Sequence, residues 1–350
     1  MLFTFATLIF TVIFFLGLFT GGKSFRDVRE QFYGNYYAED GLINQTDKPN
    51  TPQAFQNCID NKIGIKTELF MTADNRIAIS TYADLSKEYN TEKSILDCTM
   101  DQLEELGIMS LTDLIKQVDG QVPVILEIKA AADNRAMCRA VADIIIASKH
   151  KNIAVCSFNT SIMAWFKERE KNIFRGVVSA PAKEFKNLSK TQRWMTGNLA
   201  YNMNCRPNFM LYRNRPLSAY VKFAAMSGVL KGVWTLDNAQ EAKALEEDKE
   251  LIIVRGFMPE TVHFKDLPAA PAPVTPNKMQ PADAPAPIRQ RSISEILADD
   301  EGLEEASQQD GVFDELEAEV EKLFIKAKEE VSEAIEEVKE EIAELKEKAE

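Results

Sequence analysis

The feature that most constrains the fold is a repeated alternation of short apolar runs with amphipathic segments between Phe32 and Phe264. The apolar runs predict strands at 35–38, 64–71, 76–80, 122–129, 153–158, 176–179, 209–212, 232–235 and 251–254. Helical patterns lie at 51–61, 110–117, 135–149, 161–169, 217–227 and 239–246. Such alternation over about eight units favours the α/β class and a parallel sheet closed into a TIM (β/α)8 barrel.

Within this region, the segment from Gly64 to Tyr82 has a strand–turn–strand pattern, with the turn at 72–75. Side chains two positions apart on a strand share one face. Lys66 and Glu68 should therefore project together from the first strand, as should Glu127 and Lys129 from a later one. In a TIM barrel, side chains at the C-terminal ends of strands form the functional site.

The first 22 residues contain no charged side chain, and about 20 apolar residues suffice to cross a bilayer as a helix. We therefore predict a transmembrane anchor at 1–22. A cleaved signal peptide is the alternative, but the charged start and the A-x-A cleavage site are both missing. Lys23, Arg26 and Arg29 follow the apolar run, which predicts a single-pass membrane protein with a cytoplasmic body.

The net charge of −13 is concentrated at the C-terminal end. Residues 293–350 hold 22 acidic and 6 basic residues, whereas the rest of the chain holds 32 acidic and 35 basic ones. A nearly neutral body without a clustered basic face gives no indication of a nucleic-acid partner.

Four regions follow from these patterns: the anchor at 1–22, the barrel at 23–266, a Pro/Ala-rich linker at 267–292, and an acidic amphipathic or coiled-coil helix at 293–350. The linker cannot form a core and should be extended. From residue 312 onward, apolar residues recur every three or four positions, which predicts an amphipathic helix. This helix is expected to pair with itself or with a protein partner; a solvated single helix is the alternative.

The five cysteines are widely spaced, odd in number and without a C-x-x-C pair. This pattern favours buried free thiols over disulfides or a zinc site. Only two histidines exist, His150 and His263. The scarcity of imidazole limits the catalytic mechanisms available to the chain.

Several short segments resemble, in order, those of bacterial glycerophosphodiester phosphodiesterases, which fold as TIM barrels. The segments are YYAEDGL, NTPQAF, the Gly64–Tyr82 stretch, VDGQVPVILEIK, CSFN and VWTLDN, and the likeness covers about 32–260. In that family two histidines act as general acid and base on a phosphodiester, an arginine binds the phosphate, and three carboxylates hold a divalent cation.

The resemblance implies that most of these groups are replaced here. The His-Arg pair corresponds to Glu39 and Asp40, the second histidine to Thr81, and one metal-binding carboxylate to Lys66. Positions that keep the family's residue, or a similar one, are Asn50, Glu68, Glu127, Lys129 and Trp234. Trp234 is either a pocket residue or a packed aromatic at the barrel end.

We therefore expect a catalytically inactive relative that binds or scaffolds, without a cofactor. The ammonium of Lys66 should lie among Glu39, Asp40, Glu68 and Glu127 and neutralise them. Candidate pocket residues are Asn50, Lys66, Lys129 and Trp234. The alternative is a divergent phosphodiesterase in which Glu68 and Glu127 bind Mg²⁺ or Ca²⁺.

Overall fold

The computed structural model describes residues 22, 26–43, 47–89, 91–218, 221–222 and 229–264. The predicted linker and acidic region lie outside these residues, as does the predicted anchor apart from Gly22. In the described ranges, no helix is long and apolar enough to span a membrane.

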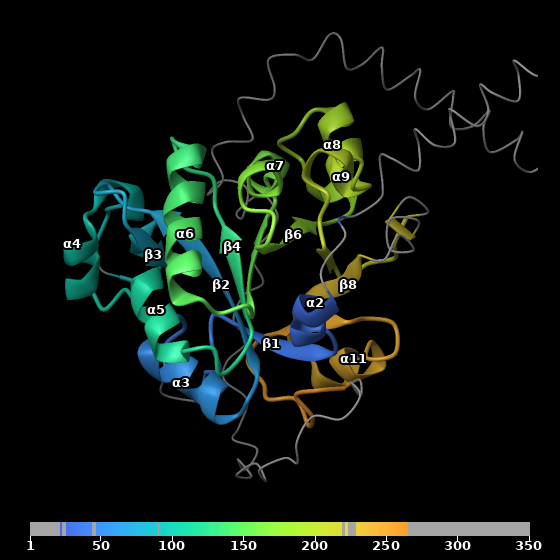
Figure 1. Ribbon diagram of the computed structural model, residues 1–350, viewed down its shortest axis with the longest axis horizontal. Coiled ribbons are helices and arrows are strands. Elements are labelled where there is room, and N and C mark those ends of the chain that lie inside the picture. Colours follow the sequence, from blue (N-terminus) through green and yellow to red (C-terminus); the bar gives the residue numbers. More distant parts are fainter. Residues whose placement is uncertain are drawn as a thin grey trace, which may run out of the picture.

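Eight parallel strands close into a barrel, as the alternation predicted (Figure 1). The neighbour order is β1-β2-β4-β5-β6-β7-β8-β9, and β1 pairs with both β2 and β9 to complete the ring. The short strand β3 pairs antiparallel with the C-terminal half of β2. All nine predicted strands are present, at β1 (Asn35–Glu39), β2 (Gly64–Met71), β3 (Ile77–Ile79), β4 (Val124–Ile128), β5 (Ile153–Ser157), β6 (Phe174–Ser179), β7 (Phe209–Arg213), β8 (Leu230–Leu236) and β9 (Leu251–Val254).

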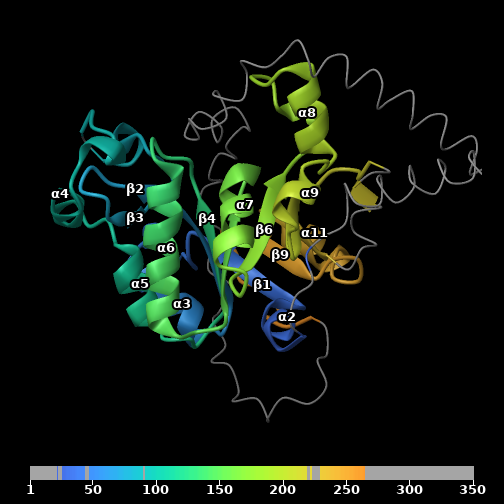
Figure 2. The ribbon, with the colours of Figure 1, turned by 45° about the horizontal axis from the view of Figure 1, so that its top comes forward.

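Helices cover the outside of the ring (Figure 2). Five correspond to predicted helices: α3 (Pro52–Asp60), α5 (Leu111–Val118), α6 (Asn134–Ser148), α7 (Thr160–Arg169) and α11 (Ala239–Ala244). Their starts follow local rules, since the side chain of Thr51 accepts a hydrogen bond from Ala54 N at α3 and Ser110 does the same for Asp113 N at α5. Most of the predicted helix at 217–227 lies outside the described residues.

The sequence patterns missed several short elements. These are α2 (Arg26–Phe32), α4 (Met100–Glu105), α8 (Lys190–Gly197), α9 (Asn202–Cys205) and three 3-10 turns at Leu85–Lys87, Ile95–Asp97 and Ala182–Glu184. Most are too short for a helical period to be visible in the sequence.

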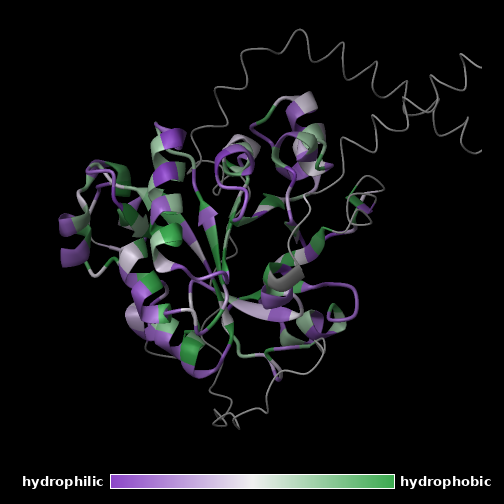
Figure 3. Cartoon of the chain, in the orientation of Figure 1, coloured by the Kyte–Doolittle hydropathy of each residue, from purple (hydrophilic) through white to green (hydrophobic). Residues whose placement is uncertain are grey.

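The barrel interior changes from apolar at its floor to charged at its mouth. Near the N-terminal ends of the strands, Phe174 stacks between Phe32 of α2 and Phe209, with ring centroids 4.8 and 5.4 Å apart. Helix α2 thus closes the floor, and hydrophobic residues dominate the strands above it (Figure 3). The C-terminal ends of the strands, where the candidate residues lie, form the opposite end.

Candidate functional site

Strand register brings the charged residues of three neighbouring strands together at the barrel mouth. Glu39 of β1 is paired with Lys66 of β2, and Glu68 of β2 is paired with Glu127 of β4. Because alternate residues of a strand point inward, Lys66 and Glu68 both enter the barrel. Glu127 and Lys129 do so from β4 and the position just after it.

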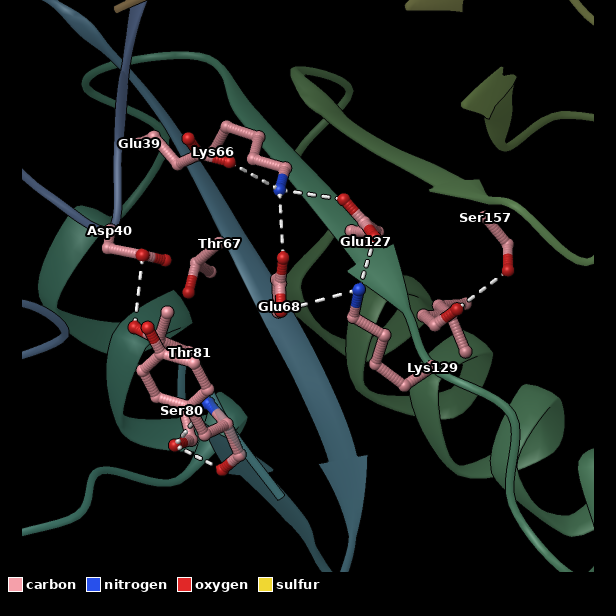
Figure 4. A network of polar contacts seen from close by, with 12 residues as sticks. Glu39, Asp40, Lys66, Thr67, Glu68, Ser80, Thr81, Glu127, Lys129 and Ser157 are labelled. Carbon is pink, nitrogen blue, oxygen red and sulfur yellow. Dashed lines mark hydrogen bonds and ion pairs between the residues drawn. The ribbon is translucent and has the colours of Figure 1, made fainter. Parts of the chain in front are cut away.

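Lys66 lies at the centre of these side chains (Figure 4). Its Nζ is 2.7 Å from Glu127 Oε2, 2.9 Å from Glu39 Oε1 and 3.4 Å from Glu68 Oε1. The lysine is 2 % exposed and the three carboxylates 5 % or less. A single buried ammonium therefore bridges buried carboxylates from three strands.

Two further cations complete the network. Lys129 Nζ is 2.5 Å from Glu127 Oε1 and 3.3 Å from Glu68 Oε2, so Lys129 forms ion pairs with both carboxylates. Arg255 Nη2 is 2.6 Å from Glu39 Oε2, and the hydroxyl of Thr235 donates to the same oxygen. Three carboxylates thus face three cations, and the network is electrically balanced.

Arg255 and Thr235 were not anticipated from the sequence. Arg255 follows β9, and the inward positions of that strand are Leu251 and Ile253, members of the apolar cluster inside the barrel. Extending this alternation by one step places Arg255 inside the barrel mouth. The period of two was therefore the signal that could have found it.

The network holds Glu39 and Lys66 in their charged states at neutral pH. Burial alone would raise the pKa of Glu39, but Arg255 and Lys66 hold it well below its usual range. Burial alone would lower the pKa of Lys66, yet Glu127, Glu39 and Glu68 raise it well above its usual value. Glu39 therefore stays charged and Lys66 stays protonated.

Asp40 lies apart from this network, contrary to the expectation that it would neighbour Lys66. Its backbone has φ of 60°, a left-handed conformation, and its Oδ2 accepts a hydrogen bond of 3.0 Å from Thr81. Burial raises the pKa of Asp40 to about 7, and the charges of Glu39 and Glu68 add to the rise. Its buried Oδ1 has no hydrogen-bond partner among the described residues.

Asn50 forms hydrogen bonds to the backbone of Asp40 and to Thr81, the residue that binds the Asp40 carboxylate. Its Nδ2 donates to Thr81 Oγ1 (2.9 Å), its Oδ1 accepts from Thr67 (2.7 Å), and its backbone N–H donates to the Asp40 carbonyl (2.8 Å). Asn50 does not line the pocket described next. Its observed contacts hold the loop after β1.

A small pocket of about 90 Å³ opens above the ion-pair network. Its walls include Lys66, Arg255 and Trp234. The Trp234 ring packs edge-on against Phe158, with centroids 5.6 Å apart, and its Nε1 donates to Ser179 O. Arg213 lies over the same ring at 5.7 Å. Trp234 thus serves both as packed barrel-end aromatic and as pocket wall.

The geometry at Glu68 and Glu127 does not fit a divalent cation. Mg²⁺ and Ca²⁺ need several oxygens converging within about 2.0–2.6 Å, whereas here each carboxylate turns its oxygens toward the ammonium groups of Lys66 and Lys129. Among the residues that the structure describes, no group of three or more His, Cys, Asp or Glu side chains is arranged to hold a metal ion. Lys66 lies where an ion would contact both carboxylates.

The comparisons with known proteins relate this architecture to one class of enzyme. No protein-family model and no curated protein sequence matches the chain. Among solved structures, a glycerophosphodiester phosphodiesterase from Thermotoga maritima is similar, with TM-score 0.50 and 19% identity over 63% of this chain and 93% of that one. The chain has the glycerophosphodiester phosphodiesterase fold.

Two further structures show the same fold. A phosphodiesterase from Oleispira antarctica, solved in complex with the product sn-glycerol-3-phosphate, has TM-score 0.53 and 14% identity over 64% of this chain and 94% of that one. A glycerophosphodiester phosphodiesterase from Parabacteroides distasonis has TM-score 0.50 and 18% identity over 63% of this chain and 92% of that one. The fold that the sequence resemblance implied is therefore confirmed, at low sequence identity.

Proposed function

We propose that this protein is a glycerophosphodiester phosphodiesterase-like barrel without hydrolase activity, and that it serves as a binding or scaffolding protein. The observation that carries the proposal is the position of Lys66 Nζ between Glu39, Glu68 and Glu127, within 3.4 Å of each. The ammonium neutralises the carboxylates that a catalytic cation would need.

The protonation states support this proposal. General acid–base catalysis works best when the pKa of the group lies near the operating pH. The pKa of Glu39 is held well below neutrality by Arg255 and Lys66, and the pKa of Lys66 well above it by Glu127, Glu39 and Glu68. Asp40 does have a pKa of about 7, but its carboxyl group contacts Thr81 and does not line the pocket.

The pocket itself adds a second argument. At about 90 Å³, it is much smaller than the roughly 300–1,000 Å³ typical of sites that enclose a small-molecule ligand. Arg255, which could contact an anionic phosphate, is already paired with Glu39. A phosphodiester bound to Arg255 would therefore compete with Glu39 for the same guanidinium.

The test is hydrolysis of glycerophosphocholine and of a chromogenic phosphodiester by the full-length protein, with Mg²⁺, Mn²⁺ or Ca²⁺ present. We expect no release of product above the buffer rate with any of the three cations. Turnover that disappears in both Glu68→Gln and Glu127→Gln would instead establish the alternative, a divergent metal-dependent phosphodiesterase that forms an alcohol and glycerol 3-phosphate.

We further propose a single-pass membrane location with a cytoplasmic body. The support is the uncharged run 1–22 and the positive residues that follow it. Labelling of single introduced cysteines by a membrane-impermeant maleimide tests the orientation. A cysteine in place of Glu105, which is exposed at the end of α4, should react only in permeabilised cells; equal labelling in intact cells would reverse the topology.

A further inference from the structure

A second concave surface lies on the outside of the barrel, near the N-terminal ends of the strands. It has a volume of about 420 Å³, and we refer to it as the basal groove. Its apolar wall consists of Val28 of α2, Ile145 and Ile146 of α6, and Ile153 and Ile173 beside β5 and β6.

The rim of the basal groove is positively charged. Lys149 and Lys151, which follow α6, line the groove together with His150, and no acidic residue is among the described lining residues. Ile146 is 52 % exposed, the most exposed of the large hydrophobic side chains in the described part of the chain. Ile145, Ile153 and Ile173 are 7 % exposed or less, so Ile146 provides most of the exposed apolar surface of the groove. An exposed apolar side chain bordered by cations fits an amphipathic, acidic partner.

We propose that the basal groove binds the chain's own acidic helix, beginning at Phe313. From Phe313 to Phe324 the sequence holds five acidic residues and one lysine. Phe313, Leu316, Val320 and Leu323 are spaced by three or four residues, so they would share one face of a helix. The apolar face fits the isoleucine wall, and the acidic residues beside it fit Lys149 and Lys151.

The position where the described barrel ends supports docking within one chain. Phe264 N donates to Gly34 O (3.0 Å), two residues beyond α2, which contributes Val28 to the groove. From there, 48 residues lead to Phe313. A Pro-rich linker spans about 3.1 Å per residue when extended, so the predicted linker at 267–292 alone could reach about 80 Å, several times the roughly 18 Å radius of gyration of a barrel this size. The chain between Phe264 and Phe313 is therefore long enough for the helix to reach the groove of the same molecule.

Disulfide cross-linking in the full-length protein tests the proposal. The five native cysteines are buried, so a double variant Ile146→Cys/Leu316→Cys presents one accessible pair. Leu106→Cys/Leu316→Cys is the matched control, because Leu106 is 40 % exposed at the end of α4, outside the basal groove. We expect an intramolecular cross-link at least tenfold faster in the first variant.

Charge reversal provides an independent measurement. Lys149→Glu/Lys151→Glu, added to the first cysteine pair, should slow the cross-link about tenfold, because two attractive contacts become repulsive. Both lysines are exposed, and an unchanged unfolding temperature would show that the barrel remains folded. Equal rates for the two cysteine pairs, or no effect of charge reversal, would overturn the proposal.

Other occupants of the groove give distinct results. Cross-linked dimers without an intramolecular product would indicate that a second copy's helix binds there. Protection of Ile146→Cys from maleimide only in vesicles containing phosphatidylserine would indicate the membrane surface. Either result contradicts docking within one chain.

Discussion

Lys66 allows the interpretation of the barrel mouth to be tested by a single substitution. Lys66→Met removes the ammonium but keeps a side chain of similar length, so Glu39, Glu68 and Glu127 lose their shared cation while remaining buried. Removing one partner of a buried ion pair typically costs about 3–5 kcal/mol. For a domain of this size that corresponds to a fall in unfolding temperature of roughly 6–20 °C.

A carboxylate at the same position should make the mouth dependent on a divalent cation. Lys66→Glu changes the charge of the network by −2, which one Ca²⁺ or Mg²⁺ restores, and it adds oxygen ligands beside Glu68 and Glu127. The variant should be at least as unstable as Lys66→Met in EDTA. A cation at about 100 times its Kd should then recover roughly 2.7 kcal/mol, or about 5–11 °C.

The assay is thermal unfolding of the full-length protein, followed by tryptophan fluorescence, in EDTA and in a series of Ca²⁺ and Mg²⁺ concentrations. Trp234 lies at the mouth itself, which makes the signal sensitive to the site. Wild type is the control and should not respond to cations, because its ammonium remains in place. If wild type gained as much as Lys66→Glu, or if Lys66→Met were as stable as wild type, the proposed role of Lys66 would be refuted.

Two further predictions concern the groups around Lys66. Asp40→Asn should stabilise the protein above pH 7 by up to roughly 4 kcal/mol, but hardly at pH 4. The buried carboxyl of Asp40 has a pKa of about 7, so wild type loses stability as the pH rises from the unfolded pKa to this folded pKa, whereas an amide does not ionise. Equal differences in urea midpoint between variant and wild type at pH 4.5 and pH 8 would contradict this prediction. Arg255→Met should cost about 3–5 kcal/mol by the same assay, because it strips a buried partner from Glu39. Its control is Lys243→Met, whose ion pair with Glu260 has the same 2.6 Å length but is exposed, so no measurable change is expected; similar losses in both variants would show that burial is not the cause.

The sequence predicted the barrel well because its signals are local. Each strand of the barrel is a short apolar run between polar segments, and all nine predicted runs form strands. The position of Lys66 among Glu39, Glu68 and Glu127 was also predictable, since parallel strands bring residues at their C-terminal ends together.

Asp40 shows where sequence reasoning failed. Because the resemblance places Glu39 and Asp40 at the family's His-Arg pair, both acids were expected to lie near Lys66. A left-handed backbone at Asp40, with φ of 60°, instead directs its carboxylate to Thr81. Such a conformation depends on long-range contacts, here the Asp40 N–H bond to the Lys66 carbonyl and the Asn50 N–H bond to the Asp40 carbonyl. Neither contact has a local sequence signal.

At the mouth of the barrel, stability of the fold and binding of a divalent cation make opposite demands on the buried carboxylates. Buried carboxylates destabilise a fold unless a counter-charge is held close to them. Lys66 is part of β2, so its charge is present at every cation concentration, and it contacts carboxylates on three strands. In the proposed function, the same ammonium takes the place that a mobile cation would need in order to activate a substrate. One residue therefore accounts both for the stability of this end of the barrel and for the proposed absence of hydrolysis. It follows that variants that restore cation binding should lose stability whenever the cation is withdrawn.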